Sequence, residues 1–140
     1  VRALAAARPP SREGLWWPGD LYVAINAVPD RPSKYLTQTL ASLLGGLSPA
    51  SAQRLRGVEV LTDRAWPEVL ALTAAVAELS PLVRVVYNPA HRQTPTGDST
   101  RAWARGSVLH YVHALERCAL ANASRCLVLD DDVLATRAWL

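Results

Sequence analysis

The stretch that decides the fold is Leu21-Tyr22-Val23-Ala24-Ile25-Asn26-Ala27-Val28. It is an almost unbroken apolar run, which is typical of a strand buried on both faces of a parallel sheet. Pro29 and Pro32 follow it directly and predict a loop, because proline neither donates to a strand ladder nor continues a regular element. We therefore expect residues 21–28 to be a strand with both faces covered.

The segments after this strand alternate between helical and strand patterns. Ser33 is a suitable N-cap, leucines recur on one stripe from Leu36 to Leu44, and Gly45-Gly46 can end a helix, so a helix is expected over residues 34–44. Further strands are expected at residues 58–62, 82–87 and 126–129, and further helices at 67–79 and 100–121. This alternation predicts an α/β fold, a mostly parallel sheet with flanking helices.

The two ends of the chain read differently from its middle. Residues 1–19 form a lead-in segment rich in Ala, Arg and Pro, in which Trp16 and Trp17 are expected to pack on the domain that follows. Another helix is expected to open near Thr136. The chain starts at Val1 rather than at Met and stops in mid-pattern at Leu140, so we expect it to be a fragment of a longer protein.

Composition limits the class of protein. Half of the 140 residues are apolar and the formal net charge is only +3, with scattered arginines. Nucleic-acid binding would predict a basic stripe interleaved with aromatic residues, so we expect no nucleic-acid partner. No apolar run of the chain approaches the ~20 residues of a membrane helix.

Cys118 and Cys126 are the only cysteines, and their spacing fits neither a zinc nor a redox motif. If a helix ends between the two cysteines and a strand follows, a disulfide between them is geometrically possible. Two buried free thiols are the interpretation that we favour. Asn122-Ala123-Ser124 is an N-glycosylation sequon, a short motif that alone is weak support for a secretory lumen.

The helix expected over residues 100–121 has an apolar face, on which Tyr111, Leu115 and Cys118 fall with Trp103 and Ser107, and with Val108 and Val112 beside them. His110, Tyr111 and His113 are interpreted as packing or surface residues rather than as ligands.

Three consecutive carboxylates, Asp130-Asp131-Asp132, follow the last apolar strand. Burying one unpaired carboxylate costs several kcal/mol, and neighbouring like charges raise each other's pKa. A divalent ion removes both penalties, and Mn²⁺ or Mg²⁺ prefers such oxygen ligands. We expect Asp132 to ligate the metal, Asp130 to bind a ligating water or a ribose, and Asp131 to take either role. A solvated acidic turn that caps a following helix is the plainer alternative.

Other polar residues are expected at the same edge, because ligands of open sheets lie beyond the carboxyl ends of the strands. Arg31 could bind a phosphate and Asp30 a ribose or base, or the two could pair within a proline-bounded turn. Asp63 could accept a hydrogen bond from the base of a bound nucleotide, or it could cap the helix that begins at Pro67. Arg105 could face a diphosphate, or form an ion pair on the helix surface.

These residues carry a resemblance to a known family. The stretch Cys126-Leu127-Val128-Leu129-Asp130-Asp131-Asp132 resembles the metal-binding "DxD" element of GT-A glycosyltransferases. Residues 103–132 resemble, more narrowly, the GPI-glycan N-acetylgalactosaminyltransferases of the post-GPI-attachment-to-proteins factor four type. Residues 23–44 are similar to the branching N-acetylglucosaminyltransferase IV group. The matching side chains are Trp103, Arg105, Tyr111, Ala114, Leu115, Glu116, Cys118 and residues 127–132, and, earlier in the chain, Arg31, Tyr35, Thr39 and Leu43.

The resemblance covers residues 21–140 and is strongest in the last forty. The family usually has Glu-Asp-Asp, so Asp130 departs from it in length and keeps the charge. The resemblance implies that residues 20–140 are the N-terminal, nucleotide-sugar-binding part of a Rossmann-like GT-A domain that is truncated at its C-terminus. It also implies a UDP-sugar donor such as UDP-GalNAc, and an ion of the Mn²⁺ type. It implies a glycan acceptor such as the mannose of a GPI anchor, and a location in the lumen of the Golgi. Members of the family carry membrane segments, so the resemblance also implies membrane association only through segments outside this fragment, unless those segments are missing.

The catalytic residues are expected beyond Leu140. In the GT-A fold that the chain resembles, the general base comes from the second half of the domain. The resemblance therefore implies that this fragment is inactive alone.

Two other functions remain open at this point. The aspartates could serve a nucleotidyl or phosphoryl transferase, although the chain contains neither G-x-x-x-x-G-K-[ST] nor G-x-G-x-x-G. The chain could also be a non-catalytic nucleotide-binding module that keeps only the fold.

Overall fold

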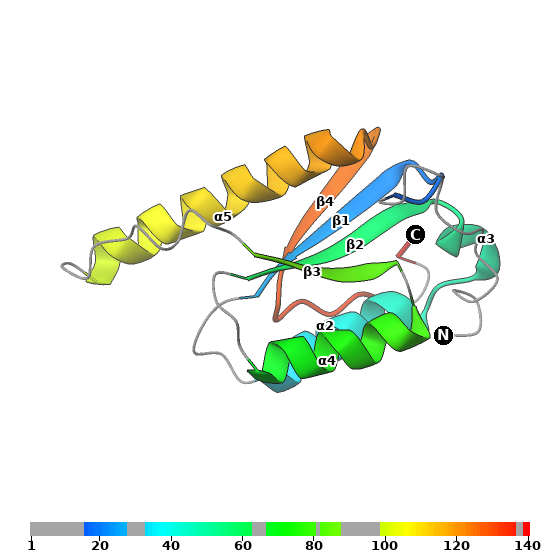
Figure 1. The fold of residues 1–140 in the computed structure, drawn as a ribbon, viewed down its shortest axis with the longest axis horizontal. Helices are drawn as coiled ribbons and strands as arrows, with labels where there is room; N and C mark the ends of the chain where they lie inside the picture. Colours follow the sequence, from blue (N-terminus) through cyan, green and yellow to red (C-terminus); the bar gives the residue numbers. More distant parts are fainter. Residues whose placement is uncertain (1–15, 28–32, 63–66, 81, 88–98, 137–138) are drawn as a thin grey trace.

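The computed structural model describes residues 16–27, 33–62, 67–80, 82–87, 99–136 and 139–140. Strands and helices alternate along the chain (Figure 1). They are β1 (Leu21–Asn26), α2 (Ser33–Gly45), α3 (Pro49–Ala52), β2 (Leu55–Thr62), α4 (Pro67–Leu79), β3 (Val83–Tyr87), α5 (Ser99–Ala121) and β4 (Arg125–Asp130).

The four strands form one sheet in the order β3-β2-β1-β4, and every neighbouring pair is parallel. β1 lies inside the sheet, between β2 and β4, and all six of its residues are buried. This confirms the predicted α/β fold with a parallel sheet, and it confirms the prediction that the first apolar run is covered on both faces.

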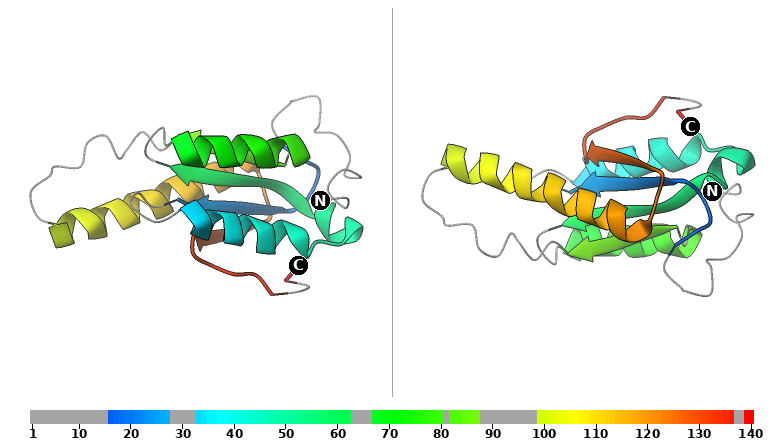
Figure 2. Two further views of the ribbon diagram at one scale, coloured as in Figure 1. Left: turned by 90° about the horizontal axis from the view of Figure 1, so that it is seen from below. Right: turned by 90° about the horizontal axis from the view of Figure 1, so that it is seen from above.

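Helices cover the two faces of the sheet. α2 and α4 lie on one face and α5 lies on the other (Figure 2). Because successive side chains of a strand point to opposite faces, Val23 and Ile25 of β1 join the core against α2, while Tyr22 and Ala24 join a second core with Ala114 of α5.

The two tryptophans before β1 pack on the domain, as predicted. Trp17 belongs to the core on the α2 side and is 6% exposed. Trp16 packs on the α5 side, edge-on to Tyr22 with ring centroids 5.7 Å apart. Between them and β1, a side chain at Gly19 would collide with the backbone of Arg54, so the lead-in approaches the start of β2 at a distance that only glycine allows.

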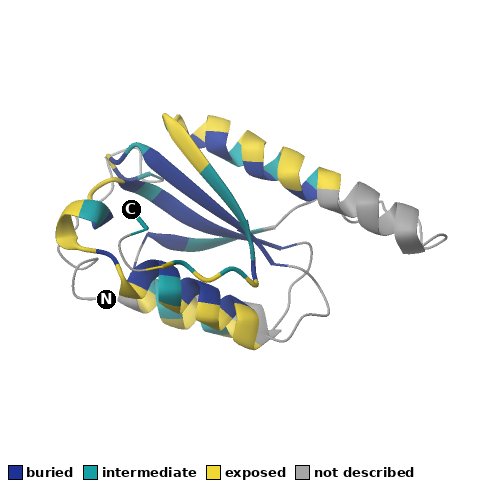
Figure 3. Cartoon of the chain, turned by 180° about the vertical axis from the view of Figure 1, so that it is seen from behind, coloured by how far each residue is buried: buried dark blue, intermediate teal, exposed yellow. Residues whose placement is uncertain are grey.

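The buried face of α5 is not the face that its apolar pattern predicts. Tyr111 and Leu115 are 47% and 59% exposed, whereas His110, Ala114, Cys118 and Ala121 are buried against the sheet (Figure 3). The helix is turned so that Arg117 reaches the buried Glu59 of β2, and Leu115, two residues earlier, then points outward. No helix in the described ranges, α5 included, is both long and apolar enough to span a bilayer.

Other element boundaries also differ from expectation. β1 ends at Asn26, so Ala27 is not part of the strand, and Val28 lies outside the described residues. β2 begins at Leu55 rather than at residue 58, and the short helix α3 precedes it. The prediction that a helix opens near Thr136 is wrong for the described residues, because residues 133–136 and 139–140 are not helical.

The last two residues are held by side-chain contacts with the backbone instead of by a helix. The indole of Trp139 donates to the carbonyl of Leu43 in α2 at 2.8 Å. The carbonyl of Leu140 accepts from the hydroxyl of Ser51 in α3 at 2.6 Å. Residues 139–140, which follow the triplet by only seven and eight positions, therefore lie against the α2–α3 side of the domain.

Candidate functional site

The carboxyl ends of four parallel strands meet at one edge of the sheet. Those ends carry Asn26 on β1, Thr62 on β2, Tyr87 on β3 and Asp130 on β4. Polar groups therefore gather at a single edge, as expected for an open α/β sheet, in which ligands bind beyond the carboxyl ends.

The acidic triplet lies where β4 ends. Asp130 is the last residue of the strand and is half-buried, Asp131 is only 3% exposed, and Asp132 is exposed in the turn that follows. The three carboxylates thus have different access to solvent. Asp132 is the most open of the three to a diffusing ion, which is consistent with the role expected for it.

Helix α2 fixes the chain around the triplet. The buried hydroxyl of Thr39 lies 2.7 Å from the carbonyl oxygen of Asp131 and 2.8 Å from that of Val133. The next turn adds Ser42, whose hydroxyl accepts from the backbone N–H of Ala135 at 3.0 Å. Because these contacts hold backbone atoms, they set the path of the turn without engaging its carboxylates.

Asn26 is a candidate site residue that the sequence patterns did not single out. It is 2% exposed, and its Oδ1 has no hydrogen-bond partner within the described part of the structure. In the sheet register it lies opposite Asp130, and directly opposed residues of parallel strands share a face. A buried amide oxygen without a partner is costly, so its place beside the triplet favours a ligand there. The feature of the sequence that could have identified Asn26 is that it is a single polar residue within the apolar run that begins at Leu21.

The other four expected donor-binding side chains are not among those that the structure describes. Asp30, Arg31 and Asp63 fall outside the described residues. Arg105 lies in the first half of α5, where the backbone is described and the side chain is not. The catalytic residues expected beyond Leu140 are not part of this sequence, so their place stays a prediction. The site is therefore built from the triplet, from Asn26 and from the α2 residues that position them.

The triplet offers enough carboxylate oxygens for an open metal site of the kind found in nucleotide-binding proteins. Among the described residues, no three His, Cys, Asp or Glu side chains converge as a closed cage. Mg²⁺-type ions in nucleotide sites, however, are held by one or two carboxylates, with water and phosphate oxygens completing the shell. Asp130 and Asp132 supply that number of hard oxygen donors, so the residues present fit an open ion site that needs a phosphate ligand.

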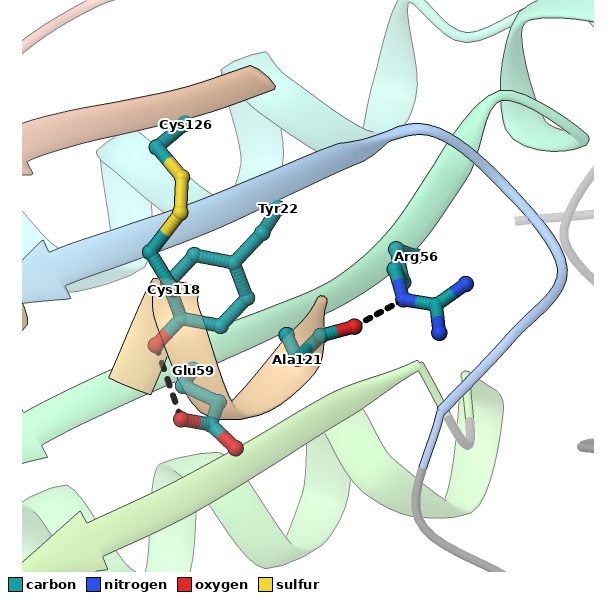
Figure 4. The surroundings of a disulfide bond; sticks show 6 residues. All are labelled: Tyr22, Arg56, Glu59, Cys118, Ala121 and Cys126. Atoms are coloured by element: carbon teal, nitrogen blue, oxygen red, sulfur yellow. Dashed lines mark hydrogen bonds between the residues drawn. A yellow bond between two sulfur atoms is a disulfide. The ribbon is translucent and has the colours of Figure 1, made fainter. Parts of the chain in front are cut away.

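The cysteines form a disulfide, so the favoured interpretation of two buried thiols is wrong. Cys118 in the last turns of α5 is joined to Cys126 in β4, with Cα atoms 6.2 Å apart (Figure 4). Cys118 is buried and Cys126 is exposed. The reason is topological: α5 returns over β4, and the turn between them brings side chains eight positions apart face to face.

A second polar cluster lies under α5, away from the carboxyl edge. Glu59 of β2 is fully buried, and its carboxylate accepts from the hydroxyl of Tyr22 at 2.8 Å (Figure 4). Arg117 of α5 donates to both carboxylate oxygens, at 2.8 and 2.7 Å. Arg84 of β3 forms a third charged contact at 2.9 Å, and its guanidinium lies 4.2 Å from the ring centroid of Trp16.

Charge and burial in this cluster shift the acid–base properties of its members. Burial, reinforced by the negative charge of Glu59, raises the pKa of Tyr22 far above its usual 10.0. The hydrogen bonds to Glu59 raise the pKa of Arg117. Burial, and then the positive charge of Arg117, lower the pKa of His113 below 6.5.

The cluster holds the fold together, because the carboxylate of Glu59 is fully engaged by Tyr22, Arg117 and Arg84. The carboxylate accepts three hydrogen bonds and forms an ion pair with Arg84, so it is enclosed by structural partners. The reactive candidate is therefore the triplet edge. No protein-family model, no curated protein and no solved structure matches this chain. Since a fold alone does not specify a function, the function is argued from that edge.

Proposed function

We propose that this chain is the nucleotide-sugar-binding part of a metal-dependent glycosyltransferase. The observation that carries the proposal is the triplet Asp130–Asp132 at the carboxyl end of β4. Its first residue, Asp130, is in register with Asn26, whose buried amide oxygen has no hydrogen-bond partner among the described residues. The donor is a UDP-sugar, UDP-GalNAc in the first instance. The acceptor is a glycan, such as the mannose of a GPI anchor, in the Golgi lumen, with membrane association through segments outside these residues.

Each described residue has a role in this proposal. Asp132, the exposed carboxylate, ligates Mn²⁺ or Mg²⁺, with Asp130 as the second carboxylate or as a partner of the ribose. Asn26 binds a polar group of the nucleoside through its side-chain oxygen. The ion, when bound, holds the diphosphate and offsets the charge that develops as it leaves. Thr39 orients the turn, and Asp30, Arg31, Asp63 and Arg105 stay predicted donor contacts.

The reaction itself needs more than these parts. Transfer to an acceptor hydroxyl calls for a general base near that hydroxyl. We assign none among the described residues and place it beyond Leu140. The isolated chain is therefore expected to bind the donor without transferring sugar. Sugar transfer by the purified 140-residue chain would contradict this expectation.

Calorimetry tests the proposal directly. The chain is titrated with UDP, UDP-GalNAc and UDP-GlcNAc in the presence of Mn²⁺ and again with a chelator. We expect binding that requires the metal, and at least a tenfold loss in Asp132→Asn, which corresponds to about 1.4 kcal/mol. Glu78→Gln, which neutralises an exposed carboxylate on α4, is the matched control and is expected to bind as the wild type does.

The same titrations separate the alternatives. UDP binding that ignores the metal would leave the triplet without its role and favour a non-catalytic nucleotide-binding module. Metal-dependent binding of a nucleoside triphosphate in preference to UDP would favour a nucleotidyl or phosphoryl transferase. Absence of any nucleotide binding by a folded chain would overturn the proposal.

A further inference from the structure

The turn between α5 and β4 carries the sequon Asn122-Ala123-Ser124. Asn122 and Ser124 are both exposed. Asn122 has a positive φ of 49°, in the left-handed region that asparagine tolerates better than most residues. Its backbone N–H donates to the carbonyl of Ala119 at 3.0 Å, which closes the end of α5. The backbone is thus anchored while the side-chain amide projects from a tight surface turn.

The disulfide spans the same turn. Cys118 and Cys126 lie four residues before and four residues after Asn122. Disulfides persist in oxidising compartments and are rare in the cytosol. Asparagine-linked glycosylation occurs in proteins that enter the same secretory compartments, where sequons lie on surface loops. Two independent features of one turn, a cross-link and an exposed sequon, therefore indicate the same environment.

The position of the turn leaves room for a bulky group. β4 begins beside the turn and ends at the acidic triplet, so the two ends of this six-residue strand are about 17 Å apart. Asn122 thus lies at the edge of the sheet opposite the carboxyl ends of the strands. A glycan there covers exposed surface of α5 and β4 and leaves the triplet edge open.

We propose that Asn122 is the acceptor of an asparagine-linked glycan. The co-substrate is an oligosaccharide carried on a polyprenyl diphosphate, which an oligosaccharyltransferase supplies. The amide nitrogen of Asn122 forms a bond to the anomeric carbon, the bond from that carbon to the diphosphate oxygen breaks, and the amide loses one proton. The lipid diphosphate leaves with the electron pair, so no oxidant or reductant is needed. The site does not depend on the proposed transferase activity.

The test expresses the full 140-residue chain behind a cleavable secretory leader in mammalian cells. Secreted and cell-retained protein is mapped by peptide mass spectrometry, before and after release of the glycan with an amidase that converts the modified asparagine to aspartate. We expect the peptide with Asn122 to carry the glycan in most molecules. The only other asparagines, Asn26 and Asn88, lie outside sequons and serve as internal controls.

Matched variants keep the result interpretable. Ser124→Ala removes the hydroxyl that the sequon requires and should abolish the glycan, whereas Ser124→Thr should retain it. Asn122→Gly removes the acceptor and suits the positive φ, so it should lose the glycan and remain folded by circular dichroism. Unmodified Asn122 in both the secreted and the retained wild-type protein would overturn the proposal, as would a glycan that survives in Ser124→Ala.

Discussion

The hydroxyl of Thr39 in α2 lies 2.7 Å from the backbone carbonyl of Asp131, the buried member of the acidic triplet, 92 positions away in the chain. The same hydroxyl lies 2.8 Å from the carbonyl of Val133. A hydroxyl has one hydrogen to donate, so the two carbonyls share it. This one buried group joins the turn after β4 to the helix after β1.

Thr39→Val tests that link. The substitution keeps the shape of the side chain and leaves the buried carbonyl of Asp131 and the part-buried carbonyl of Val133 without their donor. We therefore expect a loss of about 1–3 kcal/mol in the free energy of unfolding. Urea denaturation measures the loss, and calorimetry should show weaker metal-dependent UDP binding, because the turn is no longer held. Thr39→Ser, which keeps the hydroxyl, is the control. A valine variant as stable as the serine variant would show that the bond contributes nothing.

Arg117→Met tests the buried ion pair beneath α5. The Glu59 carboxylate is fully buried and would keep only Arg84 and Tyr22 as partners. We expect a loss of about 3 kcal/mol in the free energy of unfolding, at the lower end for broken buried pairs because Arg117 is 23% exposed. Urea denaturation measures it.

The matched control for that substitution is Arg125→Met. Arg125 pairs with Asp20 at 2.5 Å, but its side chain is 61% exposed. Exposed pairs contribute little, so the expected loss is below about 1 kcal/mol. Equal losses in the two variants would contradict the importance assigned to Glu59.

Tyr22 predicts a loss of stability in alkali. Its folded-state pKa is raised above the unfolded value of 10.0, by burial first and by Glu59 second. Its contribution is therefore complete below pH 10 and is lost as the pH rises beyond it, since the unfolded chain releases the proton more readily. Tyr22→Phe should be less stable at neutral pH and should lose less from there to about pH 11. Urea denaturation across that range measures both, and parallel curves for the two proteins would refute the prediction.

The Cys118–Cys126 disulfide predicts a redox-dependent melting temperature. Closing a short loop restricts the unfolded chain and contributes roughly 2–3 kcal/mol. Cys118→Ala with Cys126→Ala should melt lower than the oxidised wild type and should not respond to reductant, whereas the wild type should. Scanning calorimetry with and without dithiothreitol measures the difference. If full reduction left the melting temperature of the wild type unchanged, the disulfide would not contribute to its stability.

Local patterns predicted the layers of the fold. The apolar run from Leu21, the leucine stripe of residues 36–44 and the apolar residues before Asp130 predicted two strands and a helix that the structure contains. These signals succeed because a strand buried on both faces, or a helix with one buried stripe, needs its apolar residues at fixed local intervals. The strand ends then place their polar residues at one edge, whatever the order of the strands.

The orientation of α5 is a feature that local apolar patterns did not predict. Its most apolar stripe, with Val108, Tyr111, Val112 and Leu115, faces outward, because Arg117 must meet Glu59. Nothing near Glu59 in the sequence identifies it as buried, since its partners come from β1, β3 and α5. The same holds for Asn26, whose significance depends on its register with Asp130.

The amino-acid sequence by itself determined the alternation of strands and helices, the parallel sheet and the place of the acidic triplet at a strand end, because these follow from spacing along the chain. Only the tertiary structure decided the strand order, the pairing of Cys118 with Cys126 and the burial of Glu59. The burial of Glu59 is favourable only once its partners from β1, β3 and α5 surround it, and the disulfide can form only once α5 has packed beside β4. Neither arrangement follows from the local spacing of residues along the chain.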